Sequence, residues 1–137
     1  MAKERITTYI GAVLTNECDS NHHMNVMYYI NKFELANRNF MGALGVNHYM
    51  KDKDLGVVVV EQNIKYRKEV FEDDLLFIES ELISIADKTI KTHHYLYEKL
   101  SGRLSAEIEI VTLIFDMKKR KAVSIPDELR TEIEKLL

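Results

Sequence analysis

The sequence predicts an α+β fold in which a long antiparallel β-sheet curls around one central α-helix. Residues 26–44 place apolar side chains at intervals of three and four, which is the period of a helix. Four later segments are rich in β-branched and aromatic residues, and only short polar joints separate them, which favours antiparallel strands. Sheets of long strands twist and curl, so the helix can lie inside the curl.

The first strand and the helix follow one another closely along the chain. Residues 6–14, ITTYIGAVL, are β-branched and aromatic enough for a strand. The apolar face of the helix consists of Val26, Ile30, Phe33, Phe40 and Leu44, and its polar positions are Asn31, Lys32, Glu34, Asn37 and Arg38. Asn21 or Asn25 can supply the N-cap oxygen, and Gly45 stands where the C-terminal cap is expected.

The second half of the chain is predicted to be mostly sheet. Strands are expected over residues 57–66, 75–85, 89–100 and 104–115. Because the joints between them are short, we expect consecutive strands to be antiparallel neighbours, with a hairpin turn at Ser101-Gly102. Residues 127–137 follow Pro126, carry acids in the first turn and predict a short closing helix.

Composition and charge argue against several classes of protein. The chain has 137 residues, 46% of them hydrophobic and 30% charged, so we expect residues 1–137 to form one domain. A formal net charge of −3 argues against a nucleic-acid or anionic-membrane surface. The single cysteine, Cys18, cannot form an intramolecular disulfide, the first residues lack the apolar core of a secretory signal, and no apolar run approaches the ~20 residues of a membrane span. We therefore expect a cytoplasmic protein with no membrane or nucleic-acid partner.

The most unusual segment is ECDSNHHMN, residues 17–25, which lies directly before the predicted helix. Two acids, a thiol, two histidines and two asparagines are not needed to pack a core. The first N–H groups of a helix have no partner within the helix, and they lie at the positive end of its dipole. A carbonyl docked near Met24 to Val26 would therefore be polarised.

The motifs of this segment resemble those of a known family. DSNHHMNVMYY, residues 19–29, and the following FELA resemble the pattern D-x-x-G-H-x-N-x-x-x-Y with F-E-x-A, found in hotdog-fold acyl-CoA thioesterases of the 4-hydroxybenzoyl-CoA thioesterase type. Later pieces that agree are VEQNIKY at 60–66, EDDL at 72–75 and FDMKKRKAVSIP at 115–126, so the resemblance covers nearly the whole chain. The YRKEV joint and Glu109 are most similar to a branch that includes betainyl-CoA thioesterases. His22 occupies the usual glycine position, where its backbone is less free to take a positive φ.

This resemblance implies hydrolysis of an acyl-CoA to free acid and coenzyme A, without a cofactor or a metal. Asp19 matches the family's catalytic acid, which attacks the thioester directly or acts as the base on water. His23 and Asn25 match the histidine and asparagine of the motif and are expected to hold the loop and orient the carbonyl or the water. The family's site lies at a dimer interface, so a homodimer or homotetramer is implied. The expected substrate-binding residues are Met24, Val26, Tyr29, Glu61, Tyr66 and Glu109, with the last three as candidates from a partner's strands.

Each of these residues also has a simpler explanation. Asp19 can be an Asx-turn or N-cap residue before a helix, although the surrounding motif favours the catalytic role. His22 and His23 can be metal ligands, but neighbouring histidines point in divergent directions, and no H-x-x-x-H pattern completes a site. Cys18 can be a nucleophile, but the adjacent carboxylate raises the pKa of its thiol and disfavours the thiolate.

The sequence leaves the ligand and its phosphate contacts open. The alternative function is a hotdog module that binds an acyl-CoA without cleaving it, as a sensor or partner-binding domain. An enzyme of this type can act on acyl-CoA or on acyl carrier protein, and the acyl group is not specified. Residues 118–121, KKRK, either attract the phosphates of coenzyme A or form a solvated turn. His93 and His94 lie mid-strand and face opposite sides of the sheet, so they cannot act as a pair.

Overall fold

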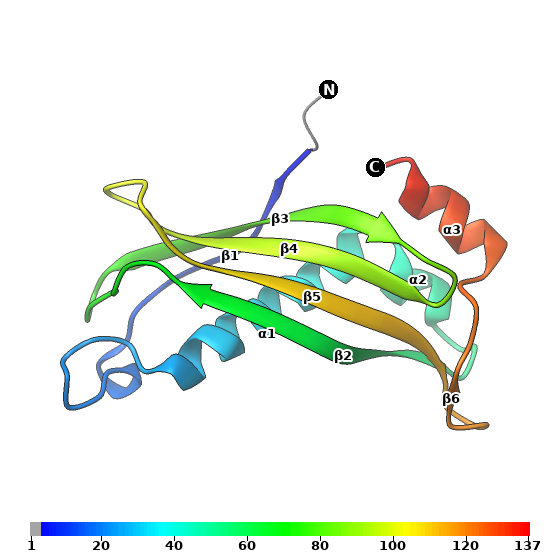
Figure 1. Cartoon of the computed structure of the whole chain (residues 1–137), viewed down its shortest axis with the longest axis horizontal. Coiled ribbons are helices and arrows are strands. Elements are labelled where there is room, and N and C mark those ends of the chain that lie inside the picture. The colour runs from blue at the N-terminus through cyan, green and yellow to red at the C-terminus, as the bar shows by residue number, and fades with distance from the viewer. Residues whose placement is uncertain (1–3) are drawn as a thin grey trace.

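The computed structural model describes residues 4–137 and shows one curled antiparallel sheet with the longest helix on its concave face (Figure 1). The strands are β1 (Ile6–Ala12), β2 (Leu55–Tyr66), β3 (Leu75–Ile85), β4 (Thr89–Glu98), β5 (Leu104–Asp116) and β6 (Lys121–Ala122). The helices are α1 (Val26–Ala43), α2 (Val46–Met50) and α3 (Asp127–Glu134), and a short 3-10 helix, η1, covers Thr15–Glu17. The predicted α+β class and the curled sheet are confirmed.

The order of the strands corrects one prediction. The sheet runs β1-β3-β4-β5-β2, so β2 and β3 lie at a distance from one another and are not the antiparallel neighbours expected from their short joint. The joint, residues 67–74, can extend over about 26 Å, which is enough to cross the end of a curled sheet. It is anchored during the crossing, because the Arg67 N–H donates to the Ser105 carbonyl at 2.8 Å and Val70 is fully buried. β2 instead pairs with β5, from Leu55 opposite Asp116 to Tyr66 opposite Ala106.

The ends of α1 follow the predicted capping residues. Asn25 is the N-cap, and its side-chain oxygen accepts the N–H of Met27. At the other end Gly45 adopts φ +84, the left-handed conformation that terminates a helix and that glycine takes without strain. The short helix α2, which begins directly after Gly45, and the strand β6 were not predicted.

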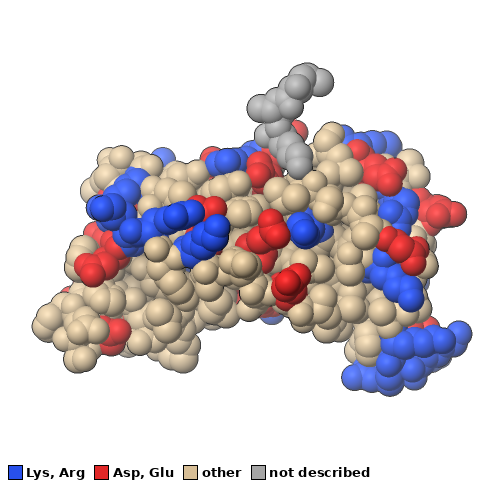
Figure 2. All heavy atoms as spheres, in the orientation of Figure 1, with Lys and Arg blue, Asp and Glu red and all other residues tan. Residues whose placement is uncertain are grey.

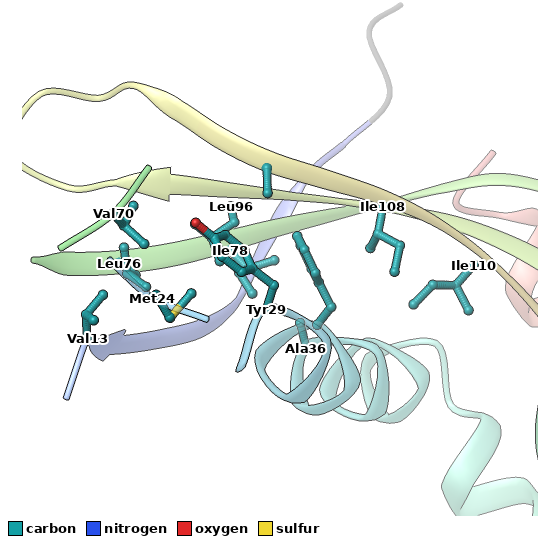
Figure 3. Packing of buried hydrophobic residues seen from close by; sticks show 12 residues of the cluster. Val13, Met24, Tyr29, Ala36, Val70, Leu76, Ile78, Leu96, Ile108 and Ile110 are labelled. Carbon is teal, nitrogen blue, oxygen red and sulfur yellow. The ribbon is translucent and has the colours of Figure 1, made fainter. Parts of the chain in front are cut away.

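The core lies between α1 and the inner face of the sheet (Figure 3). Its buried members at the loop end of α1 are Val13, Met24, Tyr29, Phe33, Ala36, Val70, Leu76, Ile78, Leu96, Ala106, Ile108 and Ile110. A second buried cluster surrounds the other end of α1, α2 and α3. Lys32 and Asn37, expected on the polar face of α1, are 3% and 4% exposed, so both lie in the interior instead.

The strand β2 is the least protected part of the sheet. It forms one edge, and its side chains Val57, Val58 and Val60 are 40%, 38% and 53% exposed. Long exposed edge strands with apolar side chains are templates for pairing with another strand. The opposite edge, β1, is covered by α1 on its inner side.

On the face shown in Figure 2, charged side chains of both signs lie mainly over the upper half, and a group of Lys and Arg stands at the lower right end. That end carries the turn between β5 and β6, where Lys118 pairs with Asp54 at 3.2 Å and the Arg120 guanidinium lies 5.1 Å from the centre of the Phe115 ring. The turn lies at the opposite end of the molecule from η1 and the loop that follows it (Figure 1). Among residues 4–137, no helix is long and apolar enough to cross a membrane.

Candidate active site

The loop between η1 and α1 is a closed, hydrogen-bonded turn. Cys18 forms a bridge with Met24, and His23 forms a second bridge with Phe71 in the β2–β3 joint. Within the loop the His22 N–H donates to the Asp19 carbonyl at 2.9 Å. His22 adopts φ +67, so this chain places a histidine in the left-handed conformation at the family's glycine position.

Each oxygen of the Asp19 carboxylate accepts a hydrogen bond. One oxygen accepts the backbone N–H of Asn21 at 2.9 Å, and the other accepts the side-chain Nδ2 of Asn25 at 3.1 Å. These hydrogen bonds, together with the field of His23, hold the pKa of Asp19 below its ordinary value. Asp19 is therefore presented as a carboxylate at neutral pH.

Asn25 joins this carboxylate to the start of α1. Its Nδ2 donates to Asp19, while its Oδ1 accepts the Met27 N–H at 3.1 Å. The same residue thus caps the helix and fixes the carboxylate relative to the helix axis. His23 has a looser contact, from Nδ1 to the Met24 carbonyl at 3.3 Å, and its side chain is half-buried.

The N–H groups at the start of α1 differ in their availability. The Met24 N–H donates to the Val70 carbonyl and the Asn25 N–H donates to the Glu17 carbonyl, both at 2.9 Å. Within the described part of the chain, the Val26 N–H has no protein acceptor. Of the three residues expected to polarise a carbonyl, only Val26 therefore retains a donor.

A cavity of about 240 Å³ lies beside this donor. It is lined by His23, Met24, Val26, Tyr29, Tyr66, Arg67, Lys68 and Glu69. The rings of Tyr29 and Tyr66 meet edge to face with centroids 5.1 Å apart, and burial raises the pKa of Tyr29 to about 12. Five of the residues predicted from the sequence therefore line one cavity, although Tyr66 comes from the same chain and not from a partner's strand as expected. Asp19 lies on the loop that supplies two of them, His23 and Met24.

Glu61 and Glu109 are not brought to this cavity within one chain. Glu109 is opposite Asn63 in the β2–β5 ladder and lies on the outer face of the sheet, where Lys91 and His93 approach it at 3.7 and 3.8 Å. Glu61 is exposed on the edge strand β2. Both lie away from the start of α1, so only a second chain can bring them to an Asp19 loop.

Sequence reasoning missed one pair of residues behind the loop. Glu17 and Lys32 form a buried ion pair at 2.8 Å, with side chains 8% and 3% exposed. Lys32 looked like a solvated helix position, and its spacing six residues after Val26 gives no sign of burial. The missed cavity residues are Arg67, Lys68 and Glu69, which belong to a joint with no periodic pattern.

Cys18 is a poor nucleophile in this setting. Partial burial and the nearby carboxylates of Glu72, Asp19 and Glu17 raise the pKa of its thiol. Its sulfur lies 3.8 Å from the Leu14 carbonyl oxygen. The thiol therefore stays protonated at neutral pH.

The architecture and the comparisons with known proteins agree. A long antiparallel sheet curled over one helix, with a polar loop and a cavity at the start of that helix, is a hotdog fold. The chain matches the model of the thioesterase-like superfamily over residues 13–133, and it belongs to that superfamily. The resemblance found in the motifs is thereby confirmed.

Individual relatives are distant but extend over nearly the whole chain. The chain is 27% identical to the long-chain acyl-CoA thioesterase FadM of Escherichia coli (strain K12) over 119 residues, which cover 87% of this chain and 90% of that protein. It is 24% identical to betainyl-CoA thioesterase of Pseudomonas aeruginosa over 132 residues, which cover 96% of this chain and 83% of that protein. A Staphylococcus aureus protein solved in complex with CoA has the same fold, with a TM-score of 0.88, 18% identity and coverage of 99% of this chain and 85% of that chain.

Proposed function

We propose that this protein hydrolyses an acyl-CoA thioester to the free acid and coenzyme A, with Asp19 as the carboxylate that drives the reaction. The observation that carries the proposal is the carboxylate itself, held ionised by Asn21 and Asn25 on the loop whose residues His23 and Met24 line an apolar cavity. Membership of the thioesterase-like superfamily and the similarity to two acyl-CoA thioesterases support the same substrate class. The names of these relatives specify different acyl groups, so a substrate panel should include both long-chain acyl-CoAs and betainyl-CoA.

The chemistry follows from the charges at the site. The thioester carbonyl docks at the start of α1, where the Val26 N–H and the positive end of the helix dipole stabilise the developing oxyanion. Asp19 either attacks the carbonyl carbon or removes a proton from the attacking water. His23 and Asn25 hold the loop in place. A thiolate is a good leaving group and needs little protonation, so the proposed cleavage requires no assigned general acid.

An acyl-CoA sensor is the second candidate function. The cavity alone favours neither function, because binding and cleavage both need it. The held carboxylate favours cleavage, since a negative charge beside a carbonyl-binding helix start would weaken simple binding. Binding of several acyl-CoAs without release of thiol from any of them would establish the sensor instead.

A second copy of the chain is the natural partner of β2. A two-fold axis perpendicular to the sheet would pair β2 with β2 of the second copy in antiparallel fashion and extend the sheet. This pairing would satisfy the free side of a 12-residue edge strand and cover its exposed valines. It would also bring residues of the partner's strands toward the Asp19 loop of the first copy. Glu61 and Glu109 are the residues predicted to reach the site in this way.

The Asp19→Asn variant tests the proposed reaction. Thiol release from the best acyl-CoA of a substrate panel is expected to fall by about 10²-fold or more, because the amide can neither attack nor accept a proton. Asp52→Asn, an exposed turn position with φ +63, removes the same charge far from the site and should leave the rate unchanged. An unchanged rate in Asp19→Asn would remove this carboxylate from the mechanism.

The Val26→Pro variant tests the oxyanion donor. Val26 is the first residue of α1, where proline fits the helix, and Asn25 already has the extended φ and ψ that precede a proline. The substitution removes one N–H and leaves the helix, so kcat is expected to fall by about 10²-fold while stability holds. Val26→Ala keeps the N–H and serves as the matched control. Equal kcat values in the two variants would show that this N–H stabilises no oxyanion.

A further inference from the structure

A buried ion pair lies directly behind the Asp19 loop. The Lys32 Nζ on α1 lies 2.8 Å from the Glu17 Oε2 on η1, and both side chains are almost completely buried. The Lys32 ammonium also lies 5.6 Å from the centre of the Tyr9 ring on β1. Neither Glu17 nor Lys32 lines the cavity, so neither contacts the substrate there.

Glu17 accepts hydrogen bonds from residues at both ends of the loop. Its Oε1 accepts the Leu14 N–H at 2.9 Å, before the loop, and its backbone carbonyl accepts the Asn25 N–H at 2.9 Å, after the loop. Asn25 in turn donates to the Asp19 carboxylate and caps α1. A continuous set of contacts therefore runs from Lys32 through Glu17 and Asn25 to Asp19.

The cost of burial makes a purely stabilising role a poor explanation. Removing two charges from water is expensive, and apolar residues of similar size often replace a buried ion pair without loss of stability. What an ion pair adds is a defined distance and direction between two elements. Here those elements are η1, which leads into the loop, and α1, whose first residue, Val26, lines the cavity and has an N–H with no acceptor among residues 4–137.

We propose that the Glu17–Lys32 ion pair is a positioning device that sets the place of the Asp19 carboxylate relative to the start of α1. The inference rests on the proposed function, because it assigns both residues to the reaction through Asp19 and Asn25. Glu17 and Lys32 are positioning residues and carry no chemical step themselves.

The test separates positioning from stability. Glu17→Gln and Lys32→Met each leave a buried charge unpaired and are expected to lower the urea midpoint of unfolding. The double variant removes both charges, keeps an oxygen for the Leu14 N–H and is expected to regain most of the midpoint that the single variants lose. Lys32→Arg keeps the charge and is expected to retain most of the activity.

Three measurements on the double variant decide whether the ion pair positions Asp19. Because small displacements of catalytic groups are costly, kcat is expected to fall by about tenfold to a hundredfold, with KM changed by less than about twofold. The acid limb of the pH–rate profile is expected to move to higher pH, because Asp19 loses a well-placed donor from Asn25. The pKa of Asp19, measured by carbon NMR in the resting protein and identified with Asp19→Asn, is expected to rise with it. The surface pair Glu132–Lys135, at 3.0 Å, provides the control double variant Glu132→Gln/Lys135→Met, which should change none of the three.

The outcomes distinguish the two proposals. A double variant with the wild-type kcat, pH profile and Asp19 pKa would overturn the positioning role. If the wild type cleaves no acyl-CoA, the proposed function is wrong, and the Asp19 pKa alone then decides the role of the ion pair. A raised pKa in the double variant, with a normal urea midpoint, would still support positioning, and an unchanged pKa would overturn it.

Discussion

His94 is a buried histidine that should make this protein lose stability in mild acid. Its ring lies between α1 and the sheet with no exposed surface, and its hydrogen-bond partners are Ser80 at 2.5 Å from Nδ1 and Thr92 and Asn37 at 2.9 and 3.2 Å from Nε2. Because the Asn37 Oδ1 only accepts, Nε2 carries the ring proton and Nδ1 accepts from Ser80. Because these partners are neutral, they stabilise the neutral imidazole. None of them is a carboxylate that would stabilise the protonated imidazolium.

The magnitude follows from the shift in pKa. Burial, with a smaller contribution from the charge of His93, lowers the pKa of His94 from 6.5 to about 3. Between these values the unfolded chain binds a proton at this residue and the folded chain does not, so stability falls as pH falls. Each pH unit corresponds to about 1.36 kcal/mol, and lowering the pH from 6.5 to 5 should cost about 2 kcal/mol at this one residue. Most carboxylates stay ionised over this range, so their contribution is small.

Urea denaturation at a fixed protein concentration, repeated from pH 7 to pH 5, measures the effect. The wild type is compared with His94→Gln, which is less stable at pH 7 but lacks the titrating ring. The control variant His48→Gln removes an exposed histidine of α2 and should keep the wild-type slope. Equal slopes in the wild type and His94→Gln would show that His94 is protonated in the folded protein or accessible to water, and the buried network described above would be wrong.

Two other features predict measurable changes. At His22, with φ +67, the β-branched variant His22→Val should lower the free energy of unfolding by about 1–2 kcal/mol, whereas His22→Gly should leave it equal or higher; equal stability of the two variants would contradict the left-handed conformation. On the edge strand, Val60→Lys should shift the mass measured by light scattering toward the monomer, while Leu100→Lys in the exposed β4–β5 turn should not. An unchanged oligomer in Val60→Lys would place the interface elsewhere.

Local patterns predicted most of the secondary structure. The apolar spacing of α1, its N-cap Asn25 and its left-handed Gly45 are properties of short segments. The structure confirms the helix and both caps, although Val26, expected on the apolar face, is 57% exposed. The strand β3 was predicted with both ends correct, at Leu75 and Ile85. The short helix α2 was missed because its five residues are too few to show a period.

Properties that depend on contacts between distant segments could not be predicted from local sequence patterns. The pairing of β2 with β5 depends on a joint that is anchored by Ser105 and Met24, which lie far from it in sequence. Lys32 is buried because it pairs with Glu17, and Asn37 is buried because it bonds to Thr92 and His94. The identity of a polar residue in a helix does not show whether such a partner exists in the interior. Polar residues are expected outside unless a partner is known, and the partners here lie on other elements.

The candidate site is formed partly by a local motif and partly by segments that are distant in the sequence. Asp19, His23 and Asn25 lie within seven residues, and one motif identified them together. The opposite wall of the cavity, from Tyr66 to Glu69, comes from the end of the edge strand β2 and the joint that follows.

This placement links the reaction to assembly. One wall of the cavity is anchored in the core by Met24 and Tyr29. The other wall continues the strand β2, whose outer side pairs with no strand among residues 4–137. Pairing of that strand with a second copy would restrain the second wall as well. The proposed edge pairing therefore predicts that Val60→Lys loses activity together with the dimer, although the substitution lies outside the cavity and leaves the Asp19 loop intact. A fully active monomer would show that the cavity of one chain is sufficient.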